Sequence, residues 1–181
     1  KYADEWVAIN AGQDGAWWMA VNHVLLKEFH YDKSVAQFLD YTRKFTDAPL
    51  LVELTQRDGR YEAGQLLRAN RLSKYAKVEN GDWKFLQLDA QSGKPVMAKG
   101  AMGQRWDKDP KNQGKWNLLY EDGMDNAPFD PTLTLLNNND EVLQVEFTEY
   151  GLKKKALRGV PVKRIDTVDG KKVTVATIYD V

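Results

Sequence analysis

One stretch near the start of the chain decides the fold: Trp6-Val-Ala-Ile-Asn-Ala-Gly-Gln-Asp-Gly-Ala-Trp-Trp-Met-Ala-Val-Asn-His-Val-Leu-Leu-Lys-Glu-Phe29. Its apolar beginning, Trp6 to Ile9, is typical of a short strand. After the glycine-containing segment Gly12-Gln13-Asp14-Gly15, apolar side chains recur at helical spacing, at Trp17, Trp18, Val21, Val24, Leu25, Leu26 and Phe29. We therefore predict a strand, a loop and a helix in that order, with the helix packed on more than one side.

A second helix is predicted to begin at Ser34, whose hydroxyl can cap the first turn while Gln37 returns the hydrogen bond. Three of its residues would face the core: Phe38, Leu39 and Thr42. Pro49 ends this helical section, and residues 50–54 read as a buried strand.

The rest of the chain is rich in turn signals, namely Asp58-Gly59, Asn80-Gly81, Ser92-Gly93, Asp122-Gly123 and Asp169-Gly170. Residues 160–165 and 173–178 predict the clearest hairpin, and residues 83–88 are expected to pair with 95–97. Residues 107–117 and 121–131 read as loops. The predicted fold class is mixed α/β, with an N-terminal Rossmann-like strand-loop-helix portion followed by a β-hairpin-rich insertion.

The composition excludes several classes of protein. The 181 residues carry 26 basic and 26 acidic side chains and no cysteine, so neither disulfides nor thiolate-bound metal clusters can form from this chain alone. No apolar run reaches the roughly 20 residues that span a bilayer. The basic run Lys153-Lys154-Lys155 reads as a solvated surface, and we expect no nucleic-acid partner.

Few residues point to chemistry. His23 and His30 would lie about 10 Å apart along one helix, at 1.5 Å per residue, too far to share a metal ion. Phosphate-binding and nucleophile motifs are missing from the sequence. A rival interpretation is a non-catalytic, β-rich binding module that uses stacking platforms for a sugar or peptide, from Trp83, Trp106, Trp116 and Tyr120.

Gly12, Gln13 and Asp14 form the one constellation that stands out, because they precede a helix N-terminus. Free backbone N–H groups there attract anions, and a carboxylate there can accept two hydrogen bonds from a ring such as guanine. The plainer alternative is that Asp14 caps the helix and Gly12 makes the turn.

The segment around Gly12, Gln13 and Asp14, together with several later segments, resembles the catalytic alpha subunit of respiratory nitrate reductase and nitrite oxidoreductase. These enzymes are molybdopterin oxidoreductases of the dimethyl sulfoxide reductase type. The matching stretches lie in the same order over nearly the whole chain, at residues 4–9, 12–16, 22–30, 45–52, 64–69, 103–106, 114–118, 157–165 and 177–180. Many members of the family have Thr where this chain has Gln13.

The resemblance implies an active site with molybdenum between two molybdopterin guanine dinucleotides, beside a 4Fe-4S cluster. It assigns contacts with the dinucleotide to Gly12, Gln13 and Asp14, and it places the ligands of both metals outside this chain. Residues 1–54 would then be part of a dinucleotide-binding α/β domain, residues 55–150 a β-rich insertion with loops, and residues 151–181 a terminal hairpin that returns to the scaffold.

The implied reaction interconverts nitrate and nitrite by two-electron oxygen-atom transfer. The implied partners are an iron–sulfur beta subunit and a membrane or haem electron-transfer subunit, which would make the enzyme membrane-associated on a side that the residues do not decide. Related molybdoenzymes that act on selenate, chlorate, perchlorate or an organic substrate remain alternatives.

We also expect an internal fragment that is inactive alone, because the chain lacks an initiator Met and its last ten residues, 172–181, read as one strand. This interpretation predicts exposed apolar surface on the helix that carries Trp17 and Trp18, and marginal stability in isolation.

Overall fold

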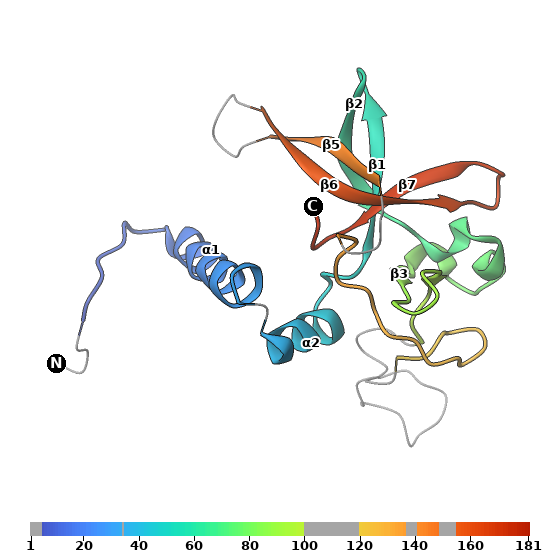
Figure 1. Ribbon diagram of the computed structural model, residues 1–181, viewed down its shortest axis with the longest axis horizontal. Coiled ribbons are helices and arrows are strands. Elements are labelled where there is room, and N and C mark those ends of the chain that lie inside the picture. The colour runs from blue at the N-terminus through green and yellow to red at the C-terminus, as the bar shows by residue number, and fades with distance from the viewer. Residues whose placement is uncertain (1–4, 34, 100–119, 137–140, 149–154) are drawn as a thin grey trace. The chain divides into compact units, whose positions relative to one another are not determined.

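The structure is a computed structural model that describes residues 5–33, 35–99, 120–136, 141–148 and 155–181. The chain divides into two compact units, Lys1–Tyr41 and Thr42–Val181 (Figure 1). The helices are α1 (Asp14–Leu25), the π-helix η1 (Leu26–Tyr31), α2 (Ala36–Phe45) and the short 3-10 helices η2 (Ala69–Arg71), η3 (Ser73–Tyr75) and η4 (Gly81–Trp83). The strands are β1 (Leu51–Arg57), β2 (Arg60–Leu66), β3 (Gln87–Leu88), β4 (Pro95–Val96), β5 (Glu141–Thr148), β6 (Lys155–Asp166) and β7 (Lys172–Thr177).

The first unit contains the predicted helix but not the predicted strand. α1 begins at Asp14, within the segment predicted to precede the helix, and Trp6 to Ile9 forms no regular element. A strand needs a neighbour for its backbone N–H and C=O groups, and no described segment pairs with this one. The Rossmann-like unit is therefore not confirmed in this chain.

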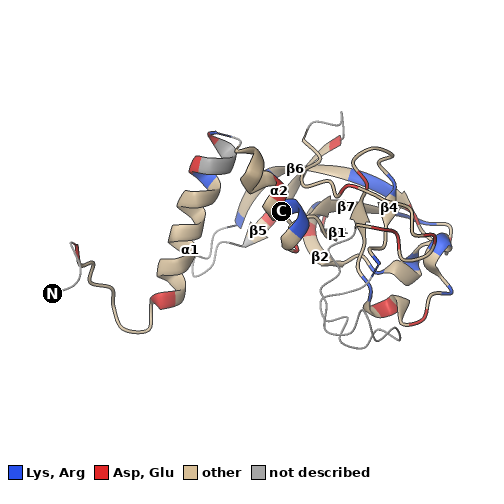
Figure 2. Ribbon diagram, turned by 90° about the horizontal axis from the view of Figure 1, so that it is seen from below, with Lys and Arg blue, Asp and Glu red and all other residues tan. Residues whose placement is uncertain are grey.

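The predicted packing of α1 is also wrong for this chain, since none of its residues is buried. The exposed apolar surface expected around Trp17 and Trp18 is confirmed, with 40% and 63% of these side chains accessible. The helix bears almost no charge along its length (Figure 2). A helix with a broad apolar face normally packs that face against another part of a protein. In this chain nothing covers the apolar face of α1 among the described residues.

α2 follows the prediction in outline. Thr42 is buried, Phe38 and Leu39 are half-buried, and Pro49 lies between the helix and β1. The predicted cap at Ser34 lies outside the described residues.

The second unit is built on a closed five-stranded barrel with the order β1-β2-β5-β6-β7 (Figure 1). All neighbouring strands are antiparallel except β2 and β5, which pair in parallel through Tyr61 with Val145 and Glu62 with Glu146. Because β7 also pairs with β1, the sheet closes and every barrel strand has two neighbours.

Two hydrophobic clusters hold this unit together. One draws on all five barrel strands and consists of Leu54, Val145, Val160, Val162 and Ala176, with Tyr61 packed against it. The other joins β1, β6 and β7 to the segment of residues 67–97, and its fully buried members include Leu51, Leu67, Tyr75, Leu86 and Val175. Two of the 3-10 helices are therefore anchored by core side chains although they are short, η2 by Ala69 and η3 by Tyr75.

The predicted hairpins are confirmed with different bounds: β6 is longer than predicted, β7 is shifted by one residue, and β3 and β4 are shorter. β6 and β7 pair around Asp169-Gly170, with Lys163 opposite Val175, and β3 and β4 pair across Ser92-Gly93 over two residues each. Trp83 lies in η4 and not in a strand. β7 ends at Thr177 instead of running to the last residue, and residues 178–180 form a turn.

The coarse fold class, mixed α/β with a sheet and few helices, is confirmed. The barrel takes strands from each of the three predicted segments, and the two compact units of the chain meet between Tyr41 and Thr42. Within the described residues, no helix is long and apolar enough to cross a membrane.

Candidate functional site

The loop of Gly12, Gln13 and Asp14 makes the tight entry to α1. Gly12 has φ +80°, a left-handed conformation that glycine adopts without strain. The Gln13 amide donates to the Asn10 carbonyl at 3.1 Å, and the Gln13 carbonyl accepts from the Trp17 amide at 2.9 Å. All three residues of the loop are exposed, and a Cβ at Gly12 would meet nothing within 4 Å.

The capping role considered for Asp14 is wrong. Gln13 occupies the N-cap position, no side chain caps the helix, and Asp14 is the first helical residue. Its carboxylate makes no hydrogen bond or ion pair with any described residue. Both carboxylate oxygens are thus free acceptors, next to first-turn N–H groups that have no acceptor within the helix.

Asp14 also stands at the N-terminal end of the apolar face of α1. Positions three and four residues apart share a helix face, so Trp17 and Trp18 follow Asp14 directly, and Val21 and Leu25 continue the row. An arrangement of two free acceptor oxygens beside aromatic rings is suited to a planar ligand that presents two adjacent N–H donors.

The histidines add nothing to this site. His23 is exposed on α1, and nothing is described for the His30 side chain. Among the described residues, no group of three or more His, Asp or Glu side chains could hold a metal ion.

The second unit contains a buried polar cluster that the sequence indicated only as the turn Asp122-Gly123. The Asp122 side chain is 3% exposed and accepts from the Tyr75 hydroxyl, from Lys74 Nζ at 2.6 Å and from the Met124 amide at 2.8 Å. Lys74 Nζ also lies 2.9 Å from Asp125.

The pKa directions in this cluster follow from its contacts. Burial raises the pKa of Tyr75 to about 12, and the hydrogen bond to Asp122 acts in the same direction. Partial burial of Lys74 acts to lower its pKa, but the hydrogen bonds to Asp122 and Asp125 outweigh it and hold the pKa above its usual value. Both groups keep their protons at neutral pH, so neither Tyr75 nor Lys74 is available as a proton acceptor or nucleophile, and the contacts of the cluster hold the fold together.

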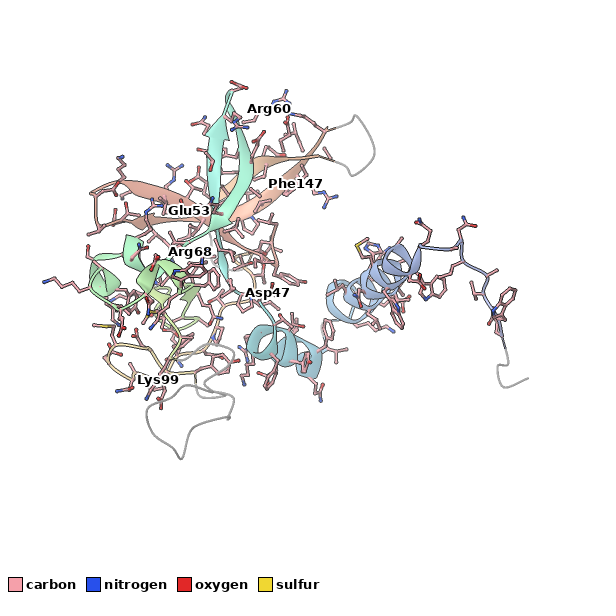
Figure 3. The ribbon with its side chains drawn as sticks, turned by 180° about the vertical axis from the view of Figure 1, so that it is seen from behind. Asp47, Glu53, Arg60, Arg68, Lys99 and Phe147 are labelled. Carbon is pink, nitrogen blue, oxygen red and sulfur yellow. The ribbon has the colours of Figure 1, made fainter. Side chains whose placement is uncertain are left out.

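Charged side chains on the barrel are largely paired. Glu146 on β5 accepts from Arg60 on β2 and Lys155 on β6, and these contacts lower the pKa of Glu146. Arg60 lies near the tip of the β1–β2 hairpin (Figure 3). Arg164 makes a bidentate ion pair with Glu141. Lys153 and Lys154, from the predicted basic run, lie outside the described residues.

The stacking platform of the binding-module interpretation is only partly described. Trp83 is 76% exposed, and the half-buried Tyr120 ring packs edge-on against Phe129 with 5.8 Å between ring centroids. Trp106 and Trp116 lie outside the described residues.

Comparison with known proteins gives a consistent result, although no family model matches the chain. The respiratory nitrate reductase 1 alpha chain of Escherichia coli is 38% identical over 192 residues, covering 99% of this chain. The nitrate reductase alpha chain of Bacillus subtilis is 33% identical over 182 residues, and the nitrate reductase alpha subunit of Mycobacterium tuberculosis is 33% identical over 189 residues.

The chain spans only 15% of the Escherichia coli protein and 14% of each of the other two. The matches nevertheless cover 99% of this chain in every case, as the resemblance found in its sequence leads one to expect. That resemblance is confirmed: over nearly its whole length, this chain is homologous to one segment of the nitrate reductase alpha chains.

Proposed function

We propose that this chain is part of the alpha subunit of a molybdenum-dependent oxidoreductase that interconverts nitrate and nitrite. The observation that carries the proposal is 38% identity, over 99% of the chain, to a protein named respiratory nitrate reductase 1 alpha chain. Because the chain spans 15% of that protein, the activity belongs to a larger subunit, and this chain alone is expected to be inactive.

Within that subunit, Gly12, Gln13 and Asp14 hold the guanine end of a molybdopterin guanine dinucleotide. The chemistry of the loop fits this ligand, since guanine presents adjacent N–H donors and the free Asp14 carboxylate offers two acceptors. Gly12 leaves open space beside the loop, so no side chain hinders the approach of a ring.

The position of Asp14 at the end of an apolar face adds a second argument. When a larger protein covers Trp17, Trp18 and Val21, Asp14 loses its water as well. A buried carboxylate without a donor is costly, which means that the covered state needs a ligand or side chain that donates to Asp14. A guanine ring meets that need.

The bound cofactor supplies two-electron oxygen-atom transfer at molybdenum; the protein residues hold and orient it. In this proposal the ligands of molybdenum and of the 4Fe-4S cluster lie in other parts of the subunit. In the complete domain, Trp6 to Ile9 would gain a partner strand and complete the Rossmann-like unit in residues 1–54.

The proposed complex includes an iron–sulfur beta subunit and a membrane or haem electron-transfer subunit, which attach the enzyme to the membrane. Three names among the relatives contain the word respiratory, and this supports electron-transfer partners. Residues 55–150 and 151–181, which form most of the barrel, then serve as scaffold.

The test is Asp14→Asn in the complete alpha subunit. The amide replaces one acceptor by a donor, so the guanine N–H groups lose a partner and face another N–H. We expect the variant to fold but to contain much less molybdenum and less GMP after acid hydrolysis, and to lose nitrate reduction in proportion.

The matched control is Asp32→Asn, which changes an exposed acid just after η1 that has no ion-pair partner among the described residues. It should keep normal cofactor content. A folded Asp14→Asn variant with full molybdenum and GMP would overturn the assignment of Asp14.

A further inference from the structure

The turn at Asn80-Gly81 has no part in the candidate site or in the buried Asp122 cluster. It is the only Asn-Gly pair in the sequence, and the structure places an exposed Asn80 before a buried Gly81, the first residue of η4. The backbone nitrogen of the residue after an asparagine can attack the side-chain amide, and glycine hinders this attack least because it has no Cβ. The pair is therefore a candidate for spontaneous chemical modification.

The reaction is deamidation through a cyclic imide. The Gly81 nitrogen forms a bond to Asn80 Cγ and gives its proton to solvent, while the C–N bond of the side-chain amide breaks and its nitrogen leaves as ammonia. Water then opens the ring at one of the two carbonyl carbons. The product is an aspartate at position 80, or an isoaspartate that adds one carbon to the main chain. Water is consumed, and nothing is oxidised or reduced.

The conformation of Asn80 opposes the closure of this ring. Asn80 has φ 56° and ψ 33°, which is the left-handed conformation. At this ψ the Gly81 nitrogen and Asn80 Cβ lie on nearly opposite sides of the Asn80 Cα–C bond. A five-membered imide needs both atoms on the same side, so the peptide between Asn80 and Gly81 has to rotate before the nitrogen can reach Cγ.

The contacts around the turn hold that peptide in place. The Gly81 amide donates to the Val78 carbonyl at 3.1 Å, and the Trp83 amide donates to the Asn80 carbonyl at 3.0 Å. Gly81 also packs closely on η2, since a Cβ added to it would lie 3.3 Å from Asn70 Cβ. Ring closure has to break the hydrogen bond of the attacking nitrogen, which means that the turn into η4 must open first.

We propose that Asn80-Gly81 is a deamidation site that the fold keeps closed, and that it reacts only while the turn into η4 is open. Local opening involves a small fraction of the molecules at any time, so the deamidation rate follows that fraction. An isoaspartate lengthens the main chain between the two hydrogen bonds of the turn, so the turn should not re-form. Deamidation at Asn80 then marks chains in which this part of the second unit has opened. The inference is independent of the proposed function.

The experiment follows deamidation of the folded 181-residue chain in mildly alkaline buffer by peptide mapping and mass spectrometry, with separation of aspartate from isoaspartate. The unfolded references are the same chain in concentrated guanidinium chloride and a synthetic peptide of residues 76–85. We expect Asn80 to react at least about tenfold more slowly in the folded chain than in either reference. Isoaspartate should form in both references, because the cyclic imide can open on either side.

Amide hydrogen exchange gives an independent measure of the same opening. Exchange of the Gly81 amide also requires loss of its hydrogen bond to Val78. Sub-denaturing urea should therefore raise the exchange rate of Gly81 and the deamidation rate of Asn80 in the same proportion. Asn80→Asp is the matched control for the product, since Asp also adopts the left-handed conformation and keeps the ordinary main chain. It should keep the wild-type urea midpoint, whereas chains with isoaspartate should unfold at lower urea.

Equal deamidation rates in the folded chain and in the peptide would overturn the proposal, because the turn would then give no protection. A deamidation rate that stays constant while urea speeds the exchange of Gly81 would overturn it too. So would a folded chain that yields aspartate without isoaspartate, since that product comes from direct hydrolysis of the amide. Slow deamidation that rises together with Gly81 exchange supports the proposal. None of these results bears on Asp14, so the proposed function is tested separately.

Discussion

The side chain of Asp122 joins its own turn to η3. Its buried carboxylate receives the Tyr75 hydroxyl from η3, the Lys74 ammonium and the Met124 amide. Asp122→Ala leaves a hydroxyl with no acceptor at a fully buried position. We expect a loss of about 1–3 kcal/mol in the free energy of unfolding of the chain, measured by urea denaturation.

Asp125→Ala is the control for this change, because Asp125 also binds Lys74 but is 52% exposed. Exposed ion pairs contribute little, so this variant should unfold close to the wild-type urea concentration. Equal losses from both substitutions would show that the ion pair with Lys74, and not the buried hydroxyl, is what stabilises the cluster.

Tyr75 gives the cluster a defined dependence on alkaline pH. Its pKa is raised from the ordinary value of 10.0 to about 12 by burial and by the hydrogen bond to Asp122. The folded protein therefore holds this proton more tightly than the unfolded chain, so the contribution of Tyr75 is complete below about pH 10 and is lost as the pH rises toward about 12.

The measurement is the urea midpoint between pH 9 and pH 12 for the wild type and for Tyr75→Phe. The wild type should start more stable and lose stability more steeply over this range, because only it has the phenol proton to lose. Parallel curves would contradict the assignment.

Among the described glycines, Gly64 in the β1–β2 hairpin lies closest to a backbone atom of a neighbouring strand. The register between these strands is irregular at Val52 and Leu54, and a Cβ at Gly64 would lie 2.9 Å from the Glu53 carbonyl oxygen. A backbone atom inside a closed barrel cannot move away freely. Gly64→Ala should therefore destabilise the chain by about 1–3 kcal/mol, as overpacking does, in thermal or urea unfolding.

Gly159→Ala is the matched substitution on β6. A Cβ there would lie 3.1 Å from Val142 Cγ1, which belongs to a half-exposed side chain that can change its rotamer. We expect a clearly smaller loss than at Gly64. A loss as large at Gly159 would mean that any added methyl group on the barrel strands is harmful, whatever atom it meets.

The elements that the sequence predicted correctly are those whose signals are local. The apolar spacing from Trp17 to Leu25 marks α1, residues 50–54 mark β1, and Asp169-Gly170 marks the β6–β7 turn, where Gly170 has φ +76°. Each depends on a few adjacent residues. The parallel pairing of Tyr61 with Val145 joins strands about 80 residues apart, and no local pattern specifies it.

The same limit applies to the candidate site. The turn at Gly12 and the helix that follows could be predicted from glycine and helical spacing, but the cap could not, because Gln13 takes that position without using its side chain. The strand at Trp6 to Ile9 failed because an apolar run becomes a strand only beside a partner. The hydrogen bonds of Asp122 with Lys74 and Tyr75 could not be predicted, because the sequence indicates only the turn at Asp122-Gly123.

At the scale of the whole molecule, stability and the candidate site belong to different units. The buried clusters lie entirely in Thr42–Val181, whereas Gly12, Gln13 and Asp14 lie in Lys1–Tyr41, whose main helix buries nothing. Local stability follows local burial. We therefore expect the two units to differ in their amide hydrogen exchange, and removal of the first unit to leave the stability of the second unchanged. Under the proposed function, the larger subunit completes the candidate site, whereas the barrel is already closed within this chain.

A variant that begins at Val35 tests this division, because it removes α1 and η1 but keeps α2 and the barrel. Its thermal midpoint should equal that of the complete 181-residue chain, since no buried residue of α1 is lost. In the complete chain, amides of α1 should exchange much faster than those of Val145, Val160 and Val175, which lie in the core. In the full-length alpha subunit the α1 amides should become protected while the barrel amides stay as they were.

A lower midpoint for the shortened variant would show instead that the first unit already stabilises the barrel, and slow exchange of α1 in the 181-residue chain would contradict its dependence on a larger protein.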